Sequence, residues 1–191
     1  MRQTLLKLSR AIFCWPPLPA TFLEKQSLID RFGCQKGINN FIETGTFQGD
    51  MIEAQRENYK KLISVELGDK LYQAAQRRFE KYDHIHLLHG DSGLKLSEAI
   101  RLVEGPALYW LDAHYSRGVT ARGEKETPIL KELSVIAARR QVGDVILIDD
   151  ARNFGMRMGY PRLATVREFV ARTWPDYSFQ IETDVICIVP P

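Results

Sequence analysis

Residues 38–49 read I-N-N-F-I-E-T-G-T-F-Q-G, an apolar run that passes directly into a loop with glycines at positions 45 and 49. The run has the length and composition of a strand that is covered on both faces. Glycines permit a sharp turn, and a helix beginning near Asp50 would offer N–H groups to a carboxylate or phosphate. The spacing of the glycines differs from the G-x-G-x-x-G dinucleotide fingerprint. The stretch therefore predicts a strand–loop–helix unit, whose loop either binds a ligand or is only a tight connection.

Four further apolar runs follow this unit and alternate with helical patterns. The runs are 61–67, 85–90, 107–112 and 145–150, and the helical patterns include 69–82, 127–140 and 163–173. Repeated strand–helix units predict a parallel sheet with right-handed crossovers. The last two runs, 178–183 and 185–190, have almost no link between them, so they must pair antiparallel. We expect an α/β fold, a Rossmann-like doubly wound sheet of five parallel strands closed by a C-terminal antiparallel hairpin.

The chain is expected to form one main domain with an N-terminal extension. Its 191 residues are ample for a single core and short for two full domains. Leu5, Leu8 and Ile12 repeat at helical spacing. We therefore assign residues 1–34 to a helical appendage and residues 35–191 to the main domain, with the appendage as a candidate contact in a homodimer.

Composition and charge argue against several classes of protein. The 26 Lys and Arg residues against 24 Asp and Glu residues leave a net charge of +2, which argues against a nucleic-acid partner. An apolar stretch of about 18 residues, the length of a transmembrane helix, is nowhere present, so we expect no membrane span. Three cysteines without a C-x-x-C pair predict a reducing compartment and a cytoplasmic location.

Each of the five parallel strands is followed by an acidic residue at the sheet edge where ligands bind in such folds: Glu43, Glu66, Asp91, Asp112 and the Asp149–Asp150 pair. Glu66 closes the second strand, where an acidic side chain can accept both hydroxyls of a ribose; a solvated acid is the alternative. Asp91 and Ser92 follow the third strand. They are placed to reach a purine amino group or to cap a helix that starts near Gly93.

These motifs together resemble class I S-adenosylmethionine-dependent methyltransferases. The resemblance is carried by E-T-G-T-F-Q-G at 43–49, by Glu66, by H-G-D-S at 89–92 and by the closing hairpin, and it covers roughly residues 35–191. It implies a seven-stranded sheet whose last strand is antiparallel, with S-adenosylmethionine as cofactor. It also implies a cofactor site with Glu43, Gly45 and Gly49 around the methionine portion, Glu66 on the ribose, Asp91 and Ser92 near the adenine, and Thr44, Thr46, Phe47, Leu67 and Asp112 beside them.

The acids after the fourth and fifth strands predict a cation. Asp112, Asp149 and Asp150 would meet at neighbouring strand ends, which is costly unless a cation or a proton lies among them. Carboxylate oxygens of this kind suit Mg²⁺. The arrangement resembles the macrocin-type, metal-dependent sugar O-methyltransferases, in which such aspartates hold the metal and deprotonation is assisted by a carboxylate. This chain reads Asp-Ala-His at 112–114 where that group more often reads Asp-Gly-Asp, and it lacks that group's longer inserts.

Two loops border the same edge of the sheet. In residues 113–127, His114 could be a general base, a metal ligand or a histidine that bonds a loop carbonyl. We expect Asp112 or His114 to take the acceptor's proton. The loops over 113–127 and 151–162 carry arginines that could hold an anionic substrate, with a solvated basic rim as the alternative: Arg117, Arg122, Arg152 and Arg157.

The sequence thus predicts an S-adenosylmethionine-dependent O-methyltransferase. Its expected acceptor is a hydroxyl on a small molecule, sugar-like or anionic, and the expected assistance comes from a divalent metal. Two alternatives stay open. One is a metal-dependent hydrolase or phosphotransferase that uses the same aspartates, and the other is a non-catalytic cofactor-binding protein on the same fold.

Overall fold

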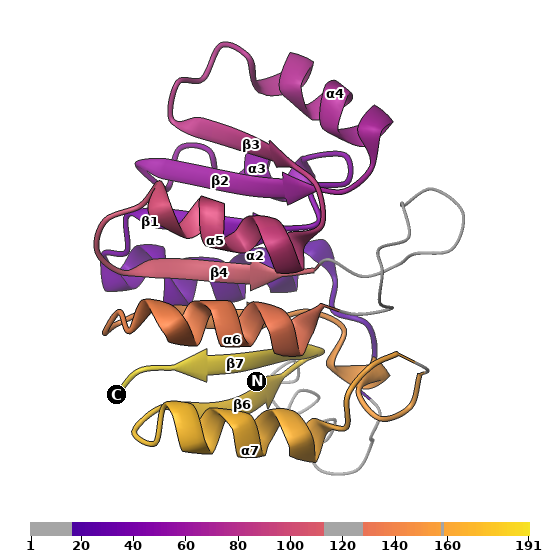
Figure 1. Cartoon of the computed structure of the whole chain (residues 1–191), viewed down its shortest axis with the longest axis vertical. Coiled ribbons are helices and arrows are strands. Elements are labelled where there is room, and N and C mark those ends of the chain that lie inside the picture. The colour runs from indigo at the N-terminus through magenta and orange to yellow at the C-terminus, as the bar shows by residue number, and fades with distance from the viewer. Residues whose placement is uncertain (1–16, 113–127, 158) are drawn as a thin grey trace, which may run out of the picture.

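The computed structural model describes residues 17–112, 128–157 and 159–191, which form a three-layer α/β/α arrangement around one sheet (Figure 1). The strand order is β3-β2-β1-β4-β5-β7-β6. Strands β1 to β5 are parallel, while β7 runs antiparallel to both β5 and β6. The predicted fold class is therefore confirmed, with these bounds: β1 Asn40–Thr44, β2 Lys61–Glu66, β3 Ile85–His89, β4 Ala107–Leu111, β5 Val145–Ile148, β6 Ser178–Glu182 and β7 Val185–Val189.

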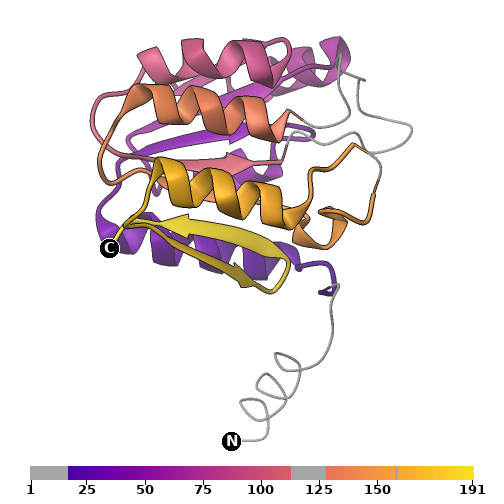
Figure 2. The ribbon, with the colours of Figure 1, turned by 60° about the horizontal axis from the view of Figure 1, so that its bottom comes forward.

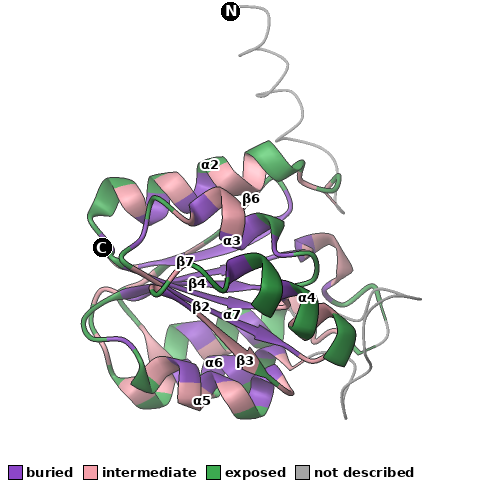
Figure 3. Cartoon of the chain, turned by 90° about the horizontal axis from the view of Figure 1, so that it is seen from above, coloured by how far each residue is buried: buried purple, intermediate pink, exposed green. Residues whose placement is uncertain are grey.

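Helices cover both faces of this sheet, with α2 lying on the opposite side from α6 and α7 (Figure 2). Buried side chains of α5, α6 and α7 belong to one core cluster, and those of α2, α3 and α4 belong to the other. The strands are largely buried between the two layers (Figure 3). The helices are α2 Phe22–Phe32, α3 Asp50–Gln55, α4 Asp69–Phe79, α5 Ser92–Arg101, α6 Ile129–Arg139 and α7 Leu163–Thr173. None of these described helices exceeds 11 residues, and none could span a bilayer.

Helix α2 packs into the core although it precedes the expected main domain. It begins with a capping box, in which the backbone N–H of Glu24 bonds Thr21 Oγ1 and the Glu24 carboxylate accepts from the backbone N–H of Thr21. Its Leu28, Ile29 and Phe32 are buried in the same cluster as β1. The boundary at residue 34 stays a prediction, and the helix expected through residues 5–12 lies outside the described residues.

The carboxyl ends of the parallel strands are aligned by their hydrogen-bond ladder. The ladder continues one residue past the strands, since the N–H of Asp112 bonds Thr44 O at 3.0 Å and the N–H of Asp149 bonds Leu111 O at 3.1 Å. On the other side of β1, the N–H of Gly45 bonds Val65 O at 2.9 Å. The residues that follow β1, β2, β4 and β5 are therefore held side by side at one edge, as the sequence predicts.

The packing of α2 predicts how substitutions within that helix affect stability. Ile29 is fully buried, whereas Leu23 on the same helix is 74% exposed. We expect Ile29→Ala to lower the free energy of unfolding by about 2–5 kcal/mol, because it opens a cavity in the core. Leu23→Ala should change the free energy by less than about 0.5 kcal/mol. Urea denaturation followed by circular dichroism measures both, and equal effects would show that α2 is not part of the cooperative core.

Candidate functional site

The glycine loop is fixed to the end of β2 by Glu66. One carboxylate oxygen of Glu66 accepts the backbone N–H of Phe47 at 2.8 Å, and the other accepts that of Gly68 at 2.8 Å. Gly49 adopts φ 81° and lies so close to the Phe79 ring that an added Cβ would be 2.7 Å from it. The loop thus needs glycine at 49, and its shape depends on the acid that the sequence assigns to the ribose.

Glu43 lies buried beneath this loop in a chain of short hydrogen bonds. Ser64 Oγ donates to Glu43 Oε2 at 2.6 Å, and the hydroxyls of Ser64 and Thr46 are 2.6 Å apart. Burial raises the pKa of Glu43 to about 8; the Ser64 hydrogen bond opposes this, and the charges of Asp112 and Glu66 add to it. Glu43 is therefore mainly protonated at neutral pH.

The other predicted cofactor residues lie along the same edge. Asp91 is the N-cap residue of α5, but its side chain makes no capping hydrogen bond. This absence favours the ligand role over the capping role considered for Asp91. Ser92 is buried beside it. The Thr44 hydroxyl at the end of β1 is also buried and has no hydrogen-bond partner in the described part of the chain.

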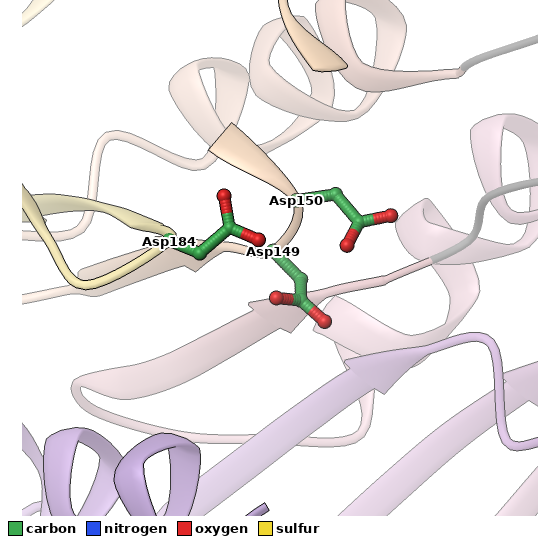
Figure 4. Close-up of side chains that lie close together, drawn as sticks. All are labelled: Asp149, Asp150 and Asp184. Atoms are coloured by element: carbon green, nitrogen blue, oxygen red, sulfur yellow. The ribbon is translucent and has the colours of Figure 1, made fainter. Parts of the chain in front are cut away.

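Three aspartates meet where β5 ends (Figure 4). Carboxylate oxygens of Asp149, Asp150 and Asp184 lie within 4.8 Å of one another. Asp184 lies in the turn directly before β7, and it joins the group because β7 runs antiparallel beside β5. Asp112, which the sequence predicts as the third acid of the group, does not belong to this cluster, and Asp184 stands in its place. The charge of Asp112 nevertheless acts on Asp149.

Protein cations already contact each carboxylate of this cluster. Lys25 of α2 forms an ion pair with Asp149 Oδ2. Arg152 pairs with Asp184 through its guanidinium and its backbone N–H, and it contacts Asp150 at 2.8 Å. Both oxygens of Asp184 are thereby occupied. With each carboxylate paired to a protein cation, this arrangement does not fit a resident Mg²⁺ ion, and no mechanistic step is derived through one.

Asp149 has one oxygen left for a ligand. Its side chain is 1% exposed, and Oδ1 has no hydrogen-bond partner among the described residues. Burial and the charge of Asp112 raise the pKa of Asp149, while the Lys25 ammonium opposes the rise. A buried carboxylate oxygen without a partner is costly, which marks the place where a ligand hydroxyl would be stabilised.

The predicted arginines and His114 are only partly placed. His114, Arg117 and Arg122 lie outside the described residues. Arg152 contacts acids of the cluster, whereas Arg157 is exposed on the loop after β5.

Sequence reasoning missed three other residues near this edge. Asp184 and Lys25 contribute the contacts described above. Tyr160 follows β5, and burial together with the charges of Asp150 and Asp112 raises the pKa of its phenol. The antiparallel placement of β7 beside β5 was the available signal for Asp184, whereas no local pattern marks Lys25.

A groove of about 740 Å³ lies at the opposite edge of the sheet. Its lining includes Asn40, Lys61 and Val145, which are the first residues of β1, β2 and β5. The groove therefore lies at the amino ends of these strands, and the acids lie at their carboxyl ends. Ligands in parallel α/β sheets bind beyond the carboxyl ends of the strands. The groove is therefore not the candidate site.

Comparisons with known proteins support the fold. No protein-family model matches the chain, and no curated protein matches it in sequence. An O-methyltransferase from Bacillus cereus in complex with S-adenosylhomocysteine has a TM-score of 0.56 and 18% sequence identity, and the match covers 98% of this chain and 89% of the other. A Podospora anserina methyltransferase with the same ligand has a TM-score of 0.59 and 17% identity, and the match covers 90% of this chain and 80% of the other. An N-methyltransferase from Bradyrhizobium japonicum has a TM-score of 0.59 and 14% identity, with 88% of this chain and 96% of the other covered.

These likenesses confirm the methyltransferase type of sheet that the sequence resemblance implies. Because the similar structures include both O- and N-methyltransferases, they leave the acceptor atom open.

The buried Glu43 predicts a pH dependence of stability. Its pKa is about 8 when folded against an ordinary value of 4.5, so the folded state holds a proton that the unfolded state has lost between these pH values. Stability should therefore fall as pH rises through this range, by up to about 1.4 kcal/mol per pH unit from this one group. Glu43→Gln keeps an acceptor for Ser64 and should remove that contribution.

Urea denaturation at pH 5, 6, 7 and 8 measures the effect. The matched control is Glu57→Gln, since the Glu57 side chain is 78% exposed. The control should follow the wild-type slope. A Glu43→Gln slope equal to the wild-type slope would contradict the raised pKa.

Proposed function

We propose that the chain is an S-adenosylmethionine-dependent O-methyltransferase that acts on a hydroxyl of a small acceptor. The observation that carries the proposal is a juxtaposition at one sheet edge. Glu66 and its glycine loop lie there at β2, and Asp149, with an open buried oxygen, follows β5. The fold that holds them is shared with methyltransferases that have S-adenosylhomocysteine bound.

The chain offers suitable partners for each part of the cofactor. Each oxygen of Glu66 accepts one backbone N–H and retains a lone pair, so the carboxylate is pre-oriented for two ribose hydroxyls. Asp91, without a capping bond, suits the adenine amino group. The Thr44 hydroxyl and protonated Glu43 border the methionine portion. When bound, S-adenosylmethionine supplies a methyl group activated on a sulfonium, so the protein has to align the acceptor and remove its proton.

Asp149 is the residue we assign to the acceptor hydroxyl. Its open Oδ1 would accept the hydrogen bond of the acceptor hydroxyl and take its proton. The bound cofactor would supply the methyl group and leave as the neutral thioether, with the electron pair of the broken carbon–sulfur bond. Asp112 and His114 are the bases expected from the sequence. Asp112 acts on Asp149 through its charge, which makes Asp149 a stronger base. Alignment of acceptor and donor contributes several kcal/mol, up to roughly 7–11 in well-oriented models.

A sugar-like or anionic acceptor suits the exposed Arg157 on the loop after β5. Arg117 and Arg122, also expected to hold an anionic substrate, lie outside the described residues. Cys34 and Cys187 are free thiols, which supports the cytoplasmic location. The proposal also includes a small-molecule substrate, no nucleic-acid partner and assembly as a homodimer. A metal-dependent hydrolase would need the ion that the cluster does not fit.

Asp91 gives a clean test of the cofactor site, because its side chain does not cap α5, whereas Glu66 also fixes the glycine loop. We expect S-adenosylhomocysteine to bind the wild-type chain with micromolar affinity. Asp91→Ala should weaken binding about 10-fold or more, since a hydrogen bond to a charged group contributes about 1.5–3 kcal/mol. Isothermal titration calorimetry measures both values.

The matched control is Asp83→Ala, an exposed aspartate before the opposite, amino end of β3. Its affinity should stay within about twofold of wild type. Absence of binding to the wild-type chain would contradict the proposed function. Binding that Asp91→Ala and Asp83→Ala leave equally unchanged would place the cofactor elsewhere.

A further inference from the structure

Helix α2 brings an ammonium group to the acidic edge of the sheet. Lys25 Nζ pairs with Asp149 and lies 5.9 Å from the centre of the Trp110 ring on β4. The Lys25 side chain is 21% exposed and that of Asp149 is 1% exposed, so the pair is largely withdrawn from water. A charge pair in such a place is retained only where the geometry compensates both ions for lost hydration.

The acids around Lys25 are the ones from which the sequence predicts a metal site. Burial lowers the pKa of Lys25, but contact with Asp149 and the charges of Asp112 and Asp150 outweigh this, so the pKa lies above its ordinary value. Arg152 contacts Asp150 on the side of the hairpin, and Lys25 approaches from the side of α2. In the described part of the chain, the Lys25 ammonium contacts Asp149, and it is close enough to Asp112 and Asp150 for their charges to act on it.

We propose that the Lys25 ammonium takes the place of the divalent cation that Asp112, Asp149 and Asp150 would otherwise bind. The inference rests on the proposed function, because it concerns the acceptor end of that site. Lys25 is then a positioning residue. It holds Asp149 Oδ2 by an ion pair and leaves Oδ1 directed to the acceptor.

An ammonium is chemically sufficient for this role. It carries three N–H donors, so a hydrogen bond to Asp149 does not exhaust it, and an acceptor oxygen can receive another. The activated methyl donor already provides the electrophile, so the acceptor oxygen needs orientation and loss of a proton rather than a Lewis acid. The N-terminal segment therefore contributes directly to the site.

The test measures binding of Mn²⁺ alone to chelator-treated full-length protein by calorimetry. The wild-type chain should show no saturable binding at micromolar to millimolar Mn²⁺. Lys25→Met keeps an apolar stem but removes the charge, and it should bind Mn²⁺ saturably, with a Kd at least 10-fold below the highest Mn²⁺ concentration that leaves the wild-type chain unsaturated. The double variant Lys25→Met, Asp149→Asn should lose that binding. Arg31→Met is the matched control, since Arg31 lies on the same helix and pairs with Glu182, which is not one of the clustered aspartates.

Two outcomes overturn the inference. One is equal Mn²⁺ behaviour of wild type and Lys25→Met, whether both bind or neither does. The other is Mn²⁺ binding by the wild-type chain that Asp149→Asn abolishes, which decides the matter even if Lys25→Met does not fold. S-adenosylhomocysteine titrations of the same samples separate the two claims. Failure of that ligand to bind contradicts the proposed function, while the Mn²⁺ results alone decide the role of Lys25.

Discussion

The contact between the Lys25 ammonium and the Asp149 carboxylate joins helix α2 to the acidic edge of the sheet, where the acceptor end of the proposed site lies. Asp149 is buried at the end of β5, where the neighbouring charge of Asp112 would make an isolated carboxylate costly. Lys25 compensates that charge from a helix 124 residues away in the chain. The same contact occupies one oxygen of Asp149 and leaves the other without a partner among the described residues, and this second oxygen is the one that we propose for the acceptor hydroxyl. On the far side, Arg152 ties the hairpin acid Asp184 to the loop after β5.

The hydrogen-bond ladder between the parallel strands brings several acidic side chains together at one edge of the sheet. Backbone bonds that continue past β1, β4 and β5 hold the following residues in line, so side chains distant in sequence become neighbours. Glu66 is an example of a residue at this edge whose carboxylate makes more than one contact. Its two oxygens shape the glycine loop and the turn at Gly68, and we propose that the same carboxylate binds the ribose. On this proposal a substitution at Glu66 disturbs the loop and the ligand together, whereas a substitution at Asp91, which makes no side-chain capping bond, affects the ligand alone.

Much of this arrangement could be predicted from local sequence, and the rest could not for physical reasons. The apolar runs and their acidic ends identified the strands and the binding edge, because period and composition report burial directly. The hairpin followed from the short link before Val185. Asp184 was missed although that antiparallel pairing implies its place beside Asp149. Lys25 lies in a segment with no motif, and its contact depends on how α2 packs across the sheet. Arg152, expected to hold substrate, instead pairs with acids of its own chain.

The most direct test is a crystal structure of the chain with S-adenosylhomocysteine and Mn²⁺, recorded with anomalous scattering at the manganese edge. We expect the ribose hydroxyls to bond Glu66 and the sulfur to face Asp149 Oδ1. We also expect the Lys25 ammonium to contact Asp149, with no anomalous peak among Asp112, Asp149 and Asp150. A manganese peak at these aspartates with Lys25 displaced, or the ligand bound away from this edge, would contradict it.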